Sequence, residues 1–211
     1  MKKRVAEFIG IMLGDGSIGE YNCKVGNKIK RHRVVKISLD SRNKQYINHV
    51  RKIMQDVLNI QPKIHYKKKE NCVDICTFTK DALIYLIKEI GLKLSPKWGR
   101  MKIPEDFMNS KFSCPVLRGL FDTDGCLSVF NNNGTIYPRI EIKMCPSPAQ
   151  EQVSEILEKL GIKHTIQNLE RGKTRVRISG KKELKKWFDL IGSSNKKHVK
   201  KANRFLKKKA L

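Results

Sequence analysis

Two Asp-Gly pairs are the residues of this chain best suited to do chemistry together. Asp15 and Asp124 lie 109 residues apart (124 minus 15), and each stands between a run of apolar residues and a glycine. Two carboxylates brought close together repel each other, and a bound divalent cation resolves that conflict. Carboxylates that hold divalent cations activate water and stabilise a departing oxygen, which is the chemistry of phosphodiester hydrolysis.

The apolar runs before these acids predict two helices that contact each other. Residues 5–13 are apolar on nearly every face, which is typical of a helix surrounded by protein. Gly10 and Gly14 lie four residues apart, as do Gly119 and Thr123, so each run carries two small residues on one face. A helical glycine costs about 1 kcal/mol relative to alanine, and close contact between two helix backbones would offset that cost. The glycine after each acid predicts a left-handed helix end.

The two runs resemble the paired motif of the LAGLIDADG homing endonucleases. Residues 117–125 match the nine letters of that motif at all but two or three positions, and residues 8–16 keep Gly10, Asp15 and Gly16. The resemblance implies a metal-dependent endonuclease that hydrolyses both strands of double-stranded DNA at a long, asymmetric site. It implies Mg²⁺ or Mn²⁺ as the cofactor.

The resemblance also implies roles for the residues around the two motifs. Asp15 and Asp124 become the metal-binding catalytic acids, and the carbonyl groups of Gly14 and Thr123 become further metal ligands. Asp122 precedes Asp124 by two residues, so on a helix it points away from that acid, and we expect it to have a structural role.

In many members of this family, one basic residue in each half polarises the phosphate or the water. The internal repeat suggests where these residues lie, because Ile90-Gly91 is followed by Lys97 and Ile191-Gly192 by Lys197. We therefore expect Lys97 and Lys197 to be catalytic. The alternatives are the neighbouring Lys196 and two lysines on predicted strands, Lys36 and Lys143.

The charge of the chain indicates a polyanionic partner. Its 211 residues contain 45 Lys and Arg against 20 Asp and Glu, which gives a net charge of +25. Nucleic acid is the first expectation and an anionic membrane surface the second. We expect no membrane insertion, because no apolar run reaches about 18 residues. The N-terminal run lacks the cleavage site of a signal peptide, and the six cysteines show no zinc spacing. These features predict an intracellular protein, cytoplasmic or organellar, that is not secreted.

Hydrophobic periodicity predicts two similar halves, residues 1–109 and 110–211. Each half reads as helix, two strands, helix, two strands, helix, and the second half adds a basic tail helix from Asn195 to Leu211. Residues 33–39 and 139–144 alternate as strands, and a polar, lysine-rich link precedes the first of these. The apolar residues of the two strands are expected to face inward, and they are Val35, Ile37, Leu39, Ile140, Ile142 and Met144. The expected fold is therefore α+β with two pseudo-symmetric αββαββα halves, the order found in the LAGLIDADG family, whose antiparallel sheets are saddle-shaped.

Outward-facing strand positions and hairpin turns are the expected DNA contacts, because two-stranded ribbons can enter the major groove. In a regular strand Arg33 and Lys36 fall on opposite faces, whereas Arg175 and Arg177 share one polar face. The expected DNA-binding residues are Lys30, Arg31, Arg33, Lys36, Lys67, Tyr137, Arg139, Lys143, Arg171, Lys173, Arg175 and Arg177.

Two other functions fit the same scaffold. One is an intron RNA maturase, and the other is a DNA-binding protein without catalysis. The presence of both Asp15 and Asp124 favours the nuclease, because binding alone does not need two acids beside a phosphate backbone. Because both motifs lie in one chain, we expect the protein to be a monomer.

Overall fold

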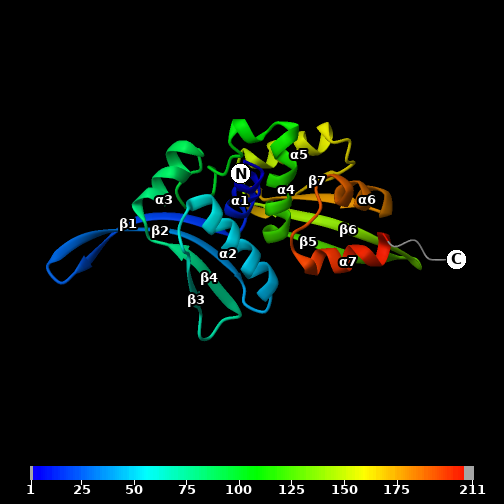
Figure 1. Cartoon of the computed structure of the whole chain (residues 1–211). Helices are drawn as coiled ribbons and strands as arrows, with labels where there is room; N and C mark the ends of the chain where they lie inside the picture. The colour runs from blue at the N-terminus through cyan, green and yellow to red at the C-terminus, as the bar shows by residue number, and fades with distance from the viewer. Residues whose placement is uncertain (1, 207–211) are drawn as a thin grey trace.

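The computed structural model describes residues 2–206, which form two halves of the same design (Figure 1). The elements of the first half are α1 (Lys2–Leu13), β1 (Gly16–Val25), β2 (Lys28–Asp40), α2 (Lys44–Leu58), β3 (Lys63–Tyr66), β4 (Cys72–Thr77), α3 (Lys80–Ile84) and η1 (Tyr85–Glu89). A linker with the short helix η2 (Glu105–Phe107) follows. The elements of the second half are α4 (Ser110–Asp124), β5 (Gly125–Asn132), β6 (Thr135–Met144), α5 (Ala149–Lys159), β7 (Thr165–Asn168), η3 (Glu170–Gly172), β8 (Thr174–Ser179), α6 (Lys181–Leu190) and α7 (Lys196–Leu206).

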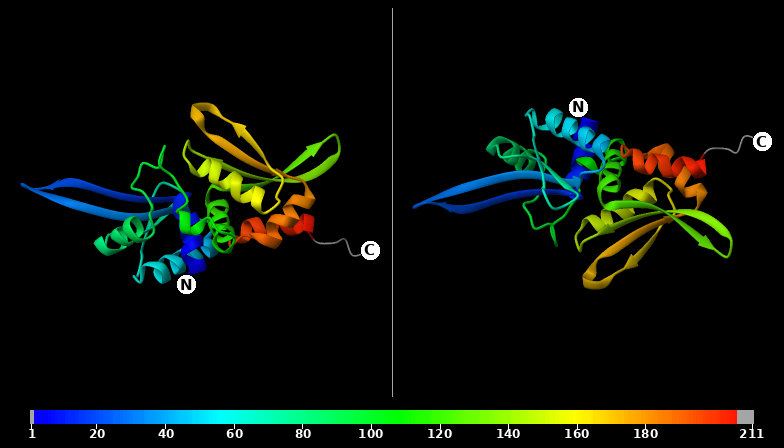
Figure 2. Two further views of the ribbon diagram at one scale, coloured as in Figure 1. Left: turned by 90° about the horizontal axis from the view of Figure 1, so that it is seen from above. Right: turned by 90° about the horizontal axis from the view of Figure 1, so that it is seen from below.

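Each half contains one antiparallel sheet of four strands, in the order β1-β2-β4-β3 or β5-β6-β8-β7. The register also repeats, because Gly16 pairs with Ile37 and Gly125 pairs with Ile142. The sheets are twisted and spread away from a central pair of helices (Figure 2). The predicted α+β fold with two αββαββα halves is confirmed.

One face of each sheet is covered by helices, and the other face is open. The predicted inward residues of the first sheet, Val35, Ile37 and Leu39, are buried, as are Ile140, Ile142 and Met144 in the second. They belong to one apolar core that runs through both halves. The alternation in the sequence therefore identified the covered face of both sheets correctly.

The predicted polar link before residue 33 is wrong, because these residues belong to a long hairpin. β1 runs to Val25 and β2 starts at Lys28, so only residues 26 and 27 form the turn. The hairpin extends beyond the body of the protein (Figure 1). No helix covers either face of its outer part, so polar residues occupy both faces and the alternating pattern is lost.

The third helix and the tail also differ in detail from the predictions. After α3 the chain continues as the π-helical turn η1 instead of a single α-helix up to Ile90. The predicted tail helix is present as α7, and residues 207–211 lie outside the described part of the chain. Within residues 2–206, no helix is long and apolar enough to span a membrane.

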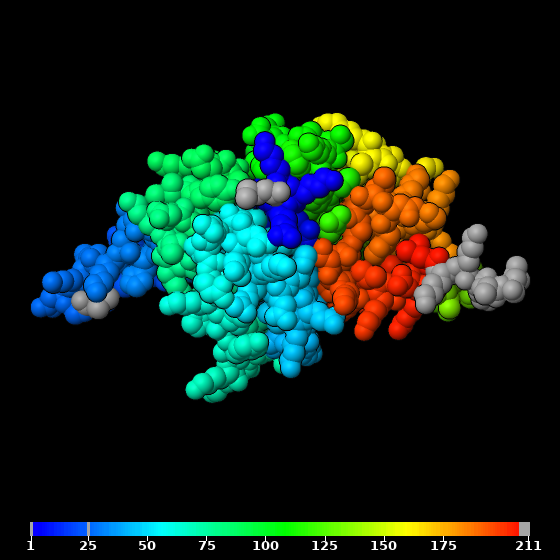
Figure 3. Space-filling view, viewed as in Figure 1, coloured from blue at the N-terminus to red at the C-terminus, as the bar shows by residue number. Residues whose placement is uncertain are grey.

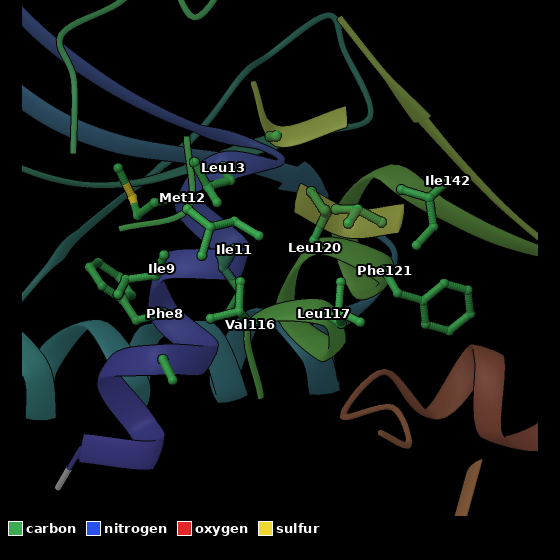
Figure 4. Packing of buried hydrophobic residues seen from close by; sticks show 14 of the residues in the cluster. Phe8, Ile9, Ile11, Met12, Leu13, Val116, Leu117, Leu120, Phe121 and Ile142 are labelled. Carbon is green, nitrogen blue, oxygen red and sulfur yellow. The ribbon is translucent and has the colours of Figure 1, made fainter. Parts of the chain in front are cut away.

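The helices α1 and α4 pack against each other, with the buried hydrophobic residues of both helices around their contact (Figure 4). A Cβ atom added at Gly10 would overlap the carbonyl oxygen of Val116 and lie 2.8 Å from the amide nitrogen of Leu120. A Cβ atom at Gly119 would overlap the carbonyl oxygen of Glu7 and lie 2.8 Å from the amide nitrogen of Ile11. The backbones therefore approach as closely as the spacing of small residues predicts.

The glycines after the two acids are required for a different reason than the predicted left-handed helix end. Gly125 has an extended conformation (φ −93°, ψ 161°), and neither Gly16 nor Gly125 has a positive φ. A Cβ atom added at Gly125 would instead lie 2.9 Å from the Cα atom of Phe121. A Cβ atom added at Gly16 would lie 2.8 Å from the sulfur of Met12. Glycine is needed here because each strand starts directly against the last turn of its helix.

Candidate active site

The helix contact brings the two acids to one place. A Cβ atom added at Gly14 would lie 3.5 Å from the carboxyl carbon of Asp124 and would overlap the side chain of Thr123. Asp15 is the next residue, so both acids lie where α1 and α4 end side by side. Helix C-termini carry partial negative charge, which further disfavours two carboxylates at this position.

The surroundings of both carboxylates raise their pKa values and so favour the protonated form. Burial by the surrounding protein raises the pKa of Asp124 to about 6, and the charge of Asp15 acts in the same direction. Burial also raises the pKa of Asp15. The ammonium group of Lys97 opposes both shifts. Two crowded carboxylates that are partly desolvated form a site whose charge a divalent cation would balance.

The donor set fits a hard cation that shares its coordination with a substrate. Asp15, Asp124 and the carbonyl groups of Gly14 and Thr123 would hold it. In residues 2–206, no cluster of three or more His, Cys, Asp or Glu side chains could hold a metal on its own. Mg²⁺ commonly binds one or two carboxylates and completes its shell with water and phosphate oxygens, so these two acids are a sufficient protein contribution.

Lys97 reaches this site from the linker. Its Nζ donates hydrogen bonds to the carbonyl oxygen of Leu13 at 2.8 Å and to that of Gly14. Burial lowers the pKa of Lys97, although the charges of Asp124 and Asp15 act to raise it. The structure therefore brings Lys97 together with both acids.

Lys197 lies in the opposite half and is held differently. It lines a cavity of about 570 Å³ together with Asp15 and Thr123. Its backbone amide donates to Oδ1 of Asn195 at 3.1 Å, while Nδ2 of Asn195 donates to the carbonyl oxygen of Asp122. In this half Asn195 thus donates a hydrogen bond to a carbonyl group at the helix end, whereas in the first half the ammonium group of Lys97 does so. The two halves are alike in fold but unequal at the site.

Of the alternative lysines, none lines this cavity. Lys196 is exposed at the start of α7, and Lys36 lies 3.8 Å from the carboxylate of Asp74 on the open face of the first sheet. Lys143 is exposed on the open face of the second sheet. The geometry therefore favours the original pair, whose catalytic role stays a prediction.

Several residues of the cavity were missed from the sequence. Tyr46 and His198 are 3% and 6% exposed, and the Tyr46 hydroxyl and the Nδ1 atom of His198 have no hydrogen-bond partner among residues 2–206. Arg42 pairs with Asp40 at 2.7 Å and lowers the pKa of that acid to about 2. The full lining is Asp15, Leu39, Asp40, Arg42, Asn43, Tyr46, Asp122, Thr123, Gly125, Asn195, Lys197 and His198. In the sequence, residues 40–43 showed only a helix-capping signal.

Asp122 supports the site instead of facing the other acids. Its carboxylate accepts hydrogen bonds from the hydroxyl of Ser193, the amide of Ser194 at 2.7 Å and the amide of Asn195 at 3.2 Å. Burial raises its pKa to about 7. Nδ2 of Asn43 donates to Asn195 at 3.0 Å, so the same segment ties the second half to the start of α2 (Figure 3).

A second polar cluster crosses between the halves at Glu7. Its carboxylate contacts Nε2 of His49 at 2.7 Å, the hydroxyl of Ser194 at 2.6 Å and the guanidinium of Arg118 at 3.4 Å. The hydrogen bonds from His49 and Ser194 outweigh burial and lower the pKa of Glu7, although burial is the largest single influence. The only sequence signal for this cluster was an acid inside an otherwise apolar run.

The expected DNA contacts divide between the two faces of the sheets. Arg31 and Arg33 share the face of the buried Val35 and both bind the carboxylate of Glu20 at 2.7 Å, and their role in DNA binding stays a prediction. Lys67 follows β3, Arg171 lies within the turn η3, and Lys173 directly follows that turn. The expected residues on the open faces are Lys30, Lys36, Tyr137, Arg139, Lys143, Arg175 and Arg177.

The open face of the second sheet holds its arginines in place. Glu141 lies 3.0 Å from Arg177, 3.9 Å from Arg175 and 4.0 Å from Arg139. The guanidinium of Arg139 also lies 3.9 Å from the ring centre of Phe130. Three arginines around one acid leave a net positive charge, and their fixed positions reduce the entropy that they lose when they bind a polyanion.

The buried imidazole of His198 predicts a specific dependence of stability on pH. Burial lowers its pKa to about 4, with Lys197 and Lys201 acting in the same direction. In the unfolded chain the imidazole of His198 takes up its proton near pH 6.5, whereas in the folded protein it does so only near pH 4. The folded protein therefore has its full stability above pH 6.5 and loses stability as the pH falls towards 4. We expect His198→Phe to remove this loss of stability. At pH 4 the loss is on the order of 3 kcal/mol in the free energy of unfolding.

Urea unfolding of wild type and His198→Phe between pH 4 and 8 measures this effect. The exposed His65, changed to Phe, is the matched control and should keep the wild-type profile. Parallel profiles for wild type and His198→Phe would contradict a neutral buried imidazole.

Comparison with known proteins agrees with this architecture. Residues 112–192 match the family model described as a LAGLIDADG-like domain, and no curated protein matches the chain by sequence. The part of the chain that the structure describes has the fold of single-chain LAGLIDADG homing endonucleases.

Three solved structures illustrate the likeness. Mesophilic variants of the homing endonuclease I-DmoI are 22% identical, with a TM-score of 0.62 over 90% of this chain and 96% of that one. I-LtrWI bound to its target DNA is 12% identical, with a TM-score of 0.66 over 97% and 89% of the two chains. I-GzeII in complex with its DNA target is also 12% identical, with a TM-score of 0.66 over 95% and 88%.

Proposed function

We propose that this protein is a site-specific DNA endonuclease that hydrolyses both strands of a long duplex site and depends on a divalent metal ion. The observation that carries the proposal is the meeting of Asp15 and Asp124 between two open, basic sheets. Solved structures of I-DmoI, which has the same fold, are complexes with DNA and Mn or with DNA and Ca. Mg²⁺ and Mn²⁺ are therefore the cations to test first.

Each group of the site has a distinct task in this reaction. The two acids and the carbonyl groups of Gly14 and Thr123 would hold the cation, which when bound would activate a water and stabilise the departing oxygen. The open faces of the sheets bind the phosphate backbone and orient the duplex across the acids. Lys97, which contacts the end of α1, and Lys197, which lines the cavity with Asp15, would each supply an ammonium group that stabilises charge on the phosphate.

The unequal setting of the two lysines predicts strand-specific defects. Each lysine belongs to one half, and each half faces one side of the duplex. We expect Lys97→Met and Lys197→Met each to slow the cutting of one strand by about 10²-fold, so that nicked circles accumulate. Supercoiled plasmid with separately labelled strands, resolved on denaturing gels, measures this effect.

The exposed Lys93 lies in the same linker as Lys97, and Lys93→Met should cut both strands at the wild-type rate. If Lys97→Met or Lys197→Met slowed the cutting of both strands equally, the assignment of one lysine to one strand would be contradicted.

The proposal is tested with DNA made from the flanks of the reading frame. A plasmid carries these flanks joined without the intervening element, and the protein is added with Mg²⁺ or Mn²⁺. Linear plasmid that is absent in EDTA supports the endonuclease. An intact plasmid would overturn the proposal, and faster splicing of intron RNA in the same preparation would assign the scaffold to a maturase. Because one chain supplies both acids, we propose that the protein acts as a monomer.

A further inference from the structure

The helix α7 carries a row of cations that the folded protein does not neutralise. Its sequence contains no acid, and Lys196, Lys200 and Arg204 recur at every fourth position, which places them on one face. In residues 2–206, none of these three side chains forms an ion pair with a carboxylate. The neighbouring helix α6 differs, because its Lys185 pairs with Asp189 at 2.6 Å.

The opposite face of α7 is fixed to the protein. His198 and Ala202 are buried, and the ring of His198 lies 4.4 Å from that of Phe121. Nζ of Lys201 donates to the carbonyl oxygen of Leu127 in the edge strand β5 at 3.2 Å. Figure 2 shows α7 at the rim of the second half. Since its apolar face is covered, the exposed basic face can bind a polyanion but cannot insert into a lipid surface.

The helix that carries the row of cations begins beside the catalytic cavity. Lys197, in the first turn of α7, lines that cavity together with Asp15, and α7 packs along the strand that follows Asp124. From Lys196 to Arg204 the helix rises about 12 Å, at 1.5 Å per residue. That length corresponds to three or four phosphates of one DNA strand, which are spaced about 3.4 Å along the duplex axis.

The first half has no equivalent helix. After η1 the chain enters the linker, whose Gly99 donates to the carbonyl oxygen of Pro146 at 2.7 Å and so packs on the second half. The basic row is therefore an asymmetric addition to a pseudo-symmetric fold.

We infer that the exposed face of α7, formed by Lys196, Lys200 and Arg204, is a phosphate-binding surface for duplex DNA that leaves the catalytic centre alongside β5. This inference rests on the proposed function, and it adds a contact outside the two sheets. If it is correct, the protein binds the DNA on one flank of the cleavage site more tightly than the DNA on the other flank.

The test compares the double variant Lys200→Ala/Arg204→Ala with the matched control Lys181→Ala/Lys182→Ala. The control removes the same charge from exposed positions of α6, which packs on the covered face of the sheet. Fluorescence anisotropy with a 40-base-pair DNA duplex in EDTA gives Kd from 0.05 to 0.3 M KCl. A 40-base-pair RNA duplex is measured in parallel, and circular dichroism verifies that both variants are folded.

We expect the α7 variant to bind the DNA duplex about 10- to 60-fold more weakly at 0.1 M salt. We also expect its slope of log affinity against log salt to fall by about 1.8, because each lost phosphate contact removes about 0.9. The α6 control should keep the wild-type affinity and slope.

Equal slopes for wild type and the α7 variant would overturn the inference while leaving the proposed nuclease intact. A loss confined to the RNA duplex would also overturn it. If wild-type protein bound no duplex DNA at all, the proposed function itself would fail.

Discussion

Asp124→Asn is expected to abolish DNA cleavage while leaving DNA binding intact. The change keeps the size of the side chain and removes one of the two carboxylates that meet at the ends of α1 and α4. Loss of one cation ligand forfeits several kcal/mol of transition-state stabilisation, which corresponds to a decrease of about 10³-fold or more in the cleavage rate. Single-turnover cleavage of the flank-derived plasmid in Mg²⁺ measures this rate, and anisotropy in Ca²⁺ measures binding.

The folded state of this variant should not be weakened. The pKa of Asp124 is raised to about 6, so at pH 7 the fold holds an ionised group that it disfavours. Asparagine removes that penalty, and the Tm in EDTA at pH 7 should equal or exceed the wild-type value. Below the unfolded-state pKa of the aspartate, the difference should vanish because the carboxyl is then protonated in both states.

Asp189→Asn, on the exposed side of α6, is the matched control and should cut at the wild-type rate. Asp15→Asn should behave like Asp124→Asn, because the two acids share one site. Cleavage at near wild-type rate by either of these two variants would remove the basis of the proposed function.

Gly119→Ala is expected to lower the free energy of unfolding by about 3 kcal/mol. The added methyl group would overlap the carbonyl oxygen of Glu7 and lie 2.8 Å from the amide of Ile11. Because these are backbone atoms, no side-chain rotation can make room, and the two helices must separate. Intrinsic helix propensity predicts the opposite sign, a stabilisation of about 1 kcal/mol, so the sign of the change decides between the two effects.

Urea denaturation followed by tryptophan fluorescence measures this change. Lys111→Ala, at an exposed position of the same helix, should leave the free energy of unfolding within about 0.5 kcal/mol of the wild-type value. Separation of the helices also separates the two acids, so Gly119→Ala should cut more slowly than its remaining folded fraction predicts. Equal or higher stability of Gly119→Ala would contradict close backbone contact between α1 and α4.

The sequence alone determined the plan of the molecule. Repeated periodic patterns identified the two halves and the covered faces of both sheets, because burial in a shared core imposes a period of two on strands and of about 3.6 on helices. The four-residue spacing of Gly10 and Gly14, and of Gly119 and Thr123, predicted the helix contact, since helix backbones can meet closely only where the side chains between them are small. The acids followed from their positions at the ends of these helices.

Tertiary structure decided everything that depends on partners distant in the chain. The outer hairpin of β1 and β2 lacks a covered face, so no pattern marked it as strands, and Arg31 and Arg33 turned out to bind Glu20. The cavity around Tyr46 and His198 combines residues from both halves, as does the cluster at Glu7. Local sequence fixes what a residue prefers, but the folded chain alone determines which polar groups meet, and here that makes two similar halves unequal at their shared site.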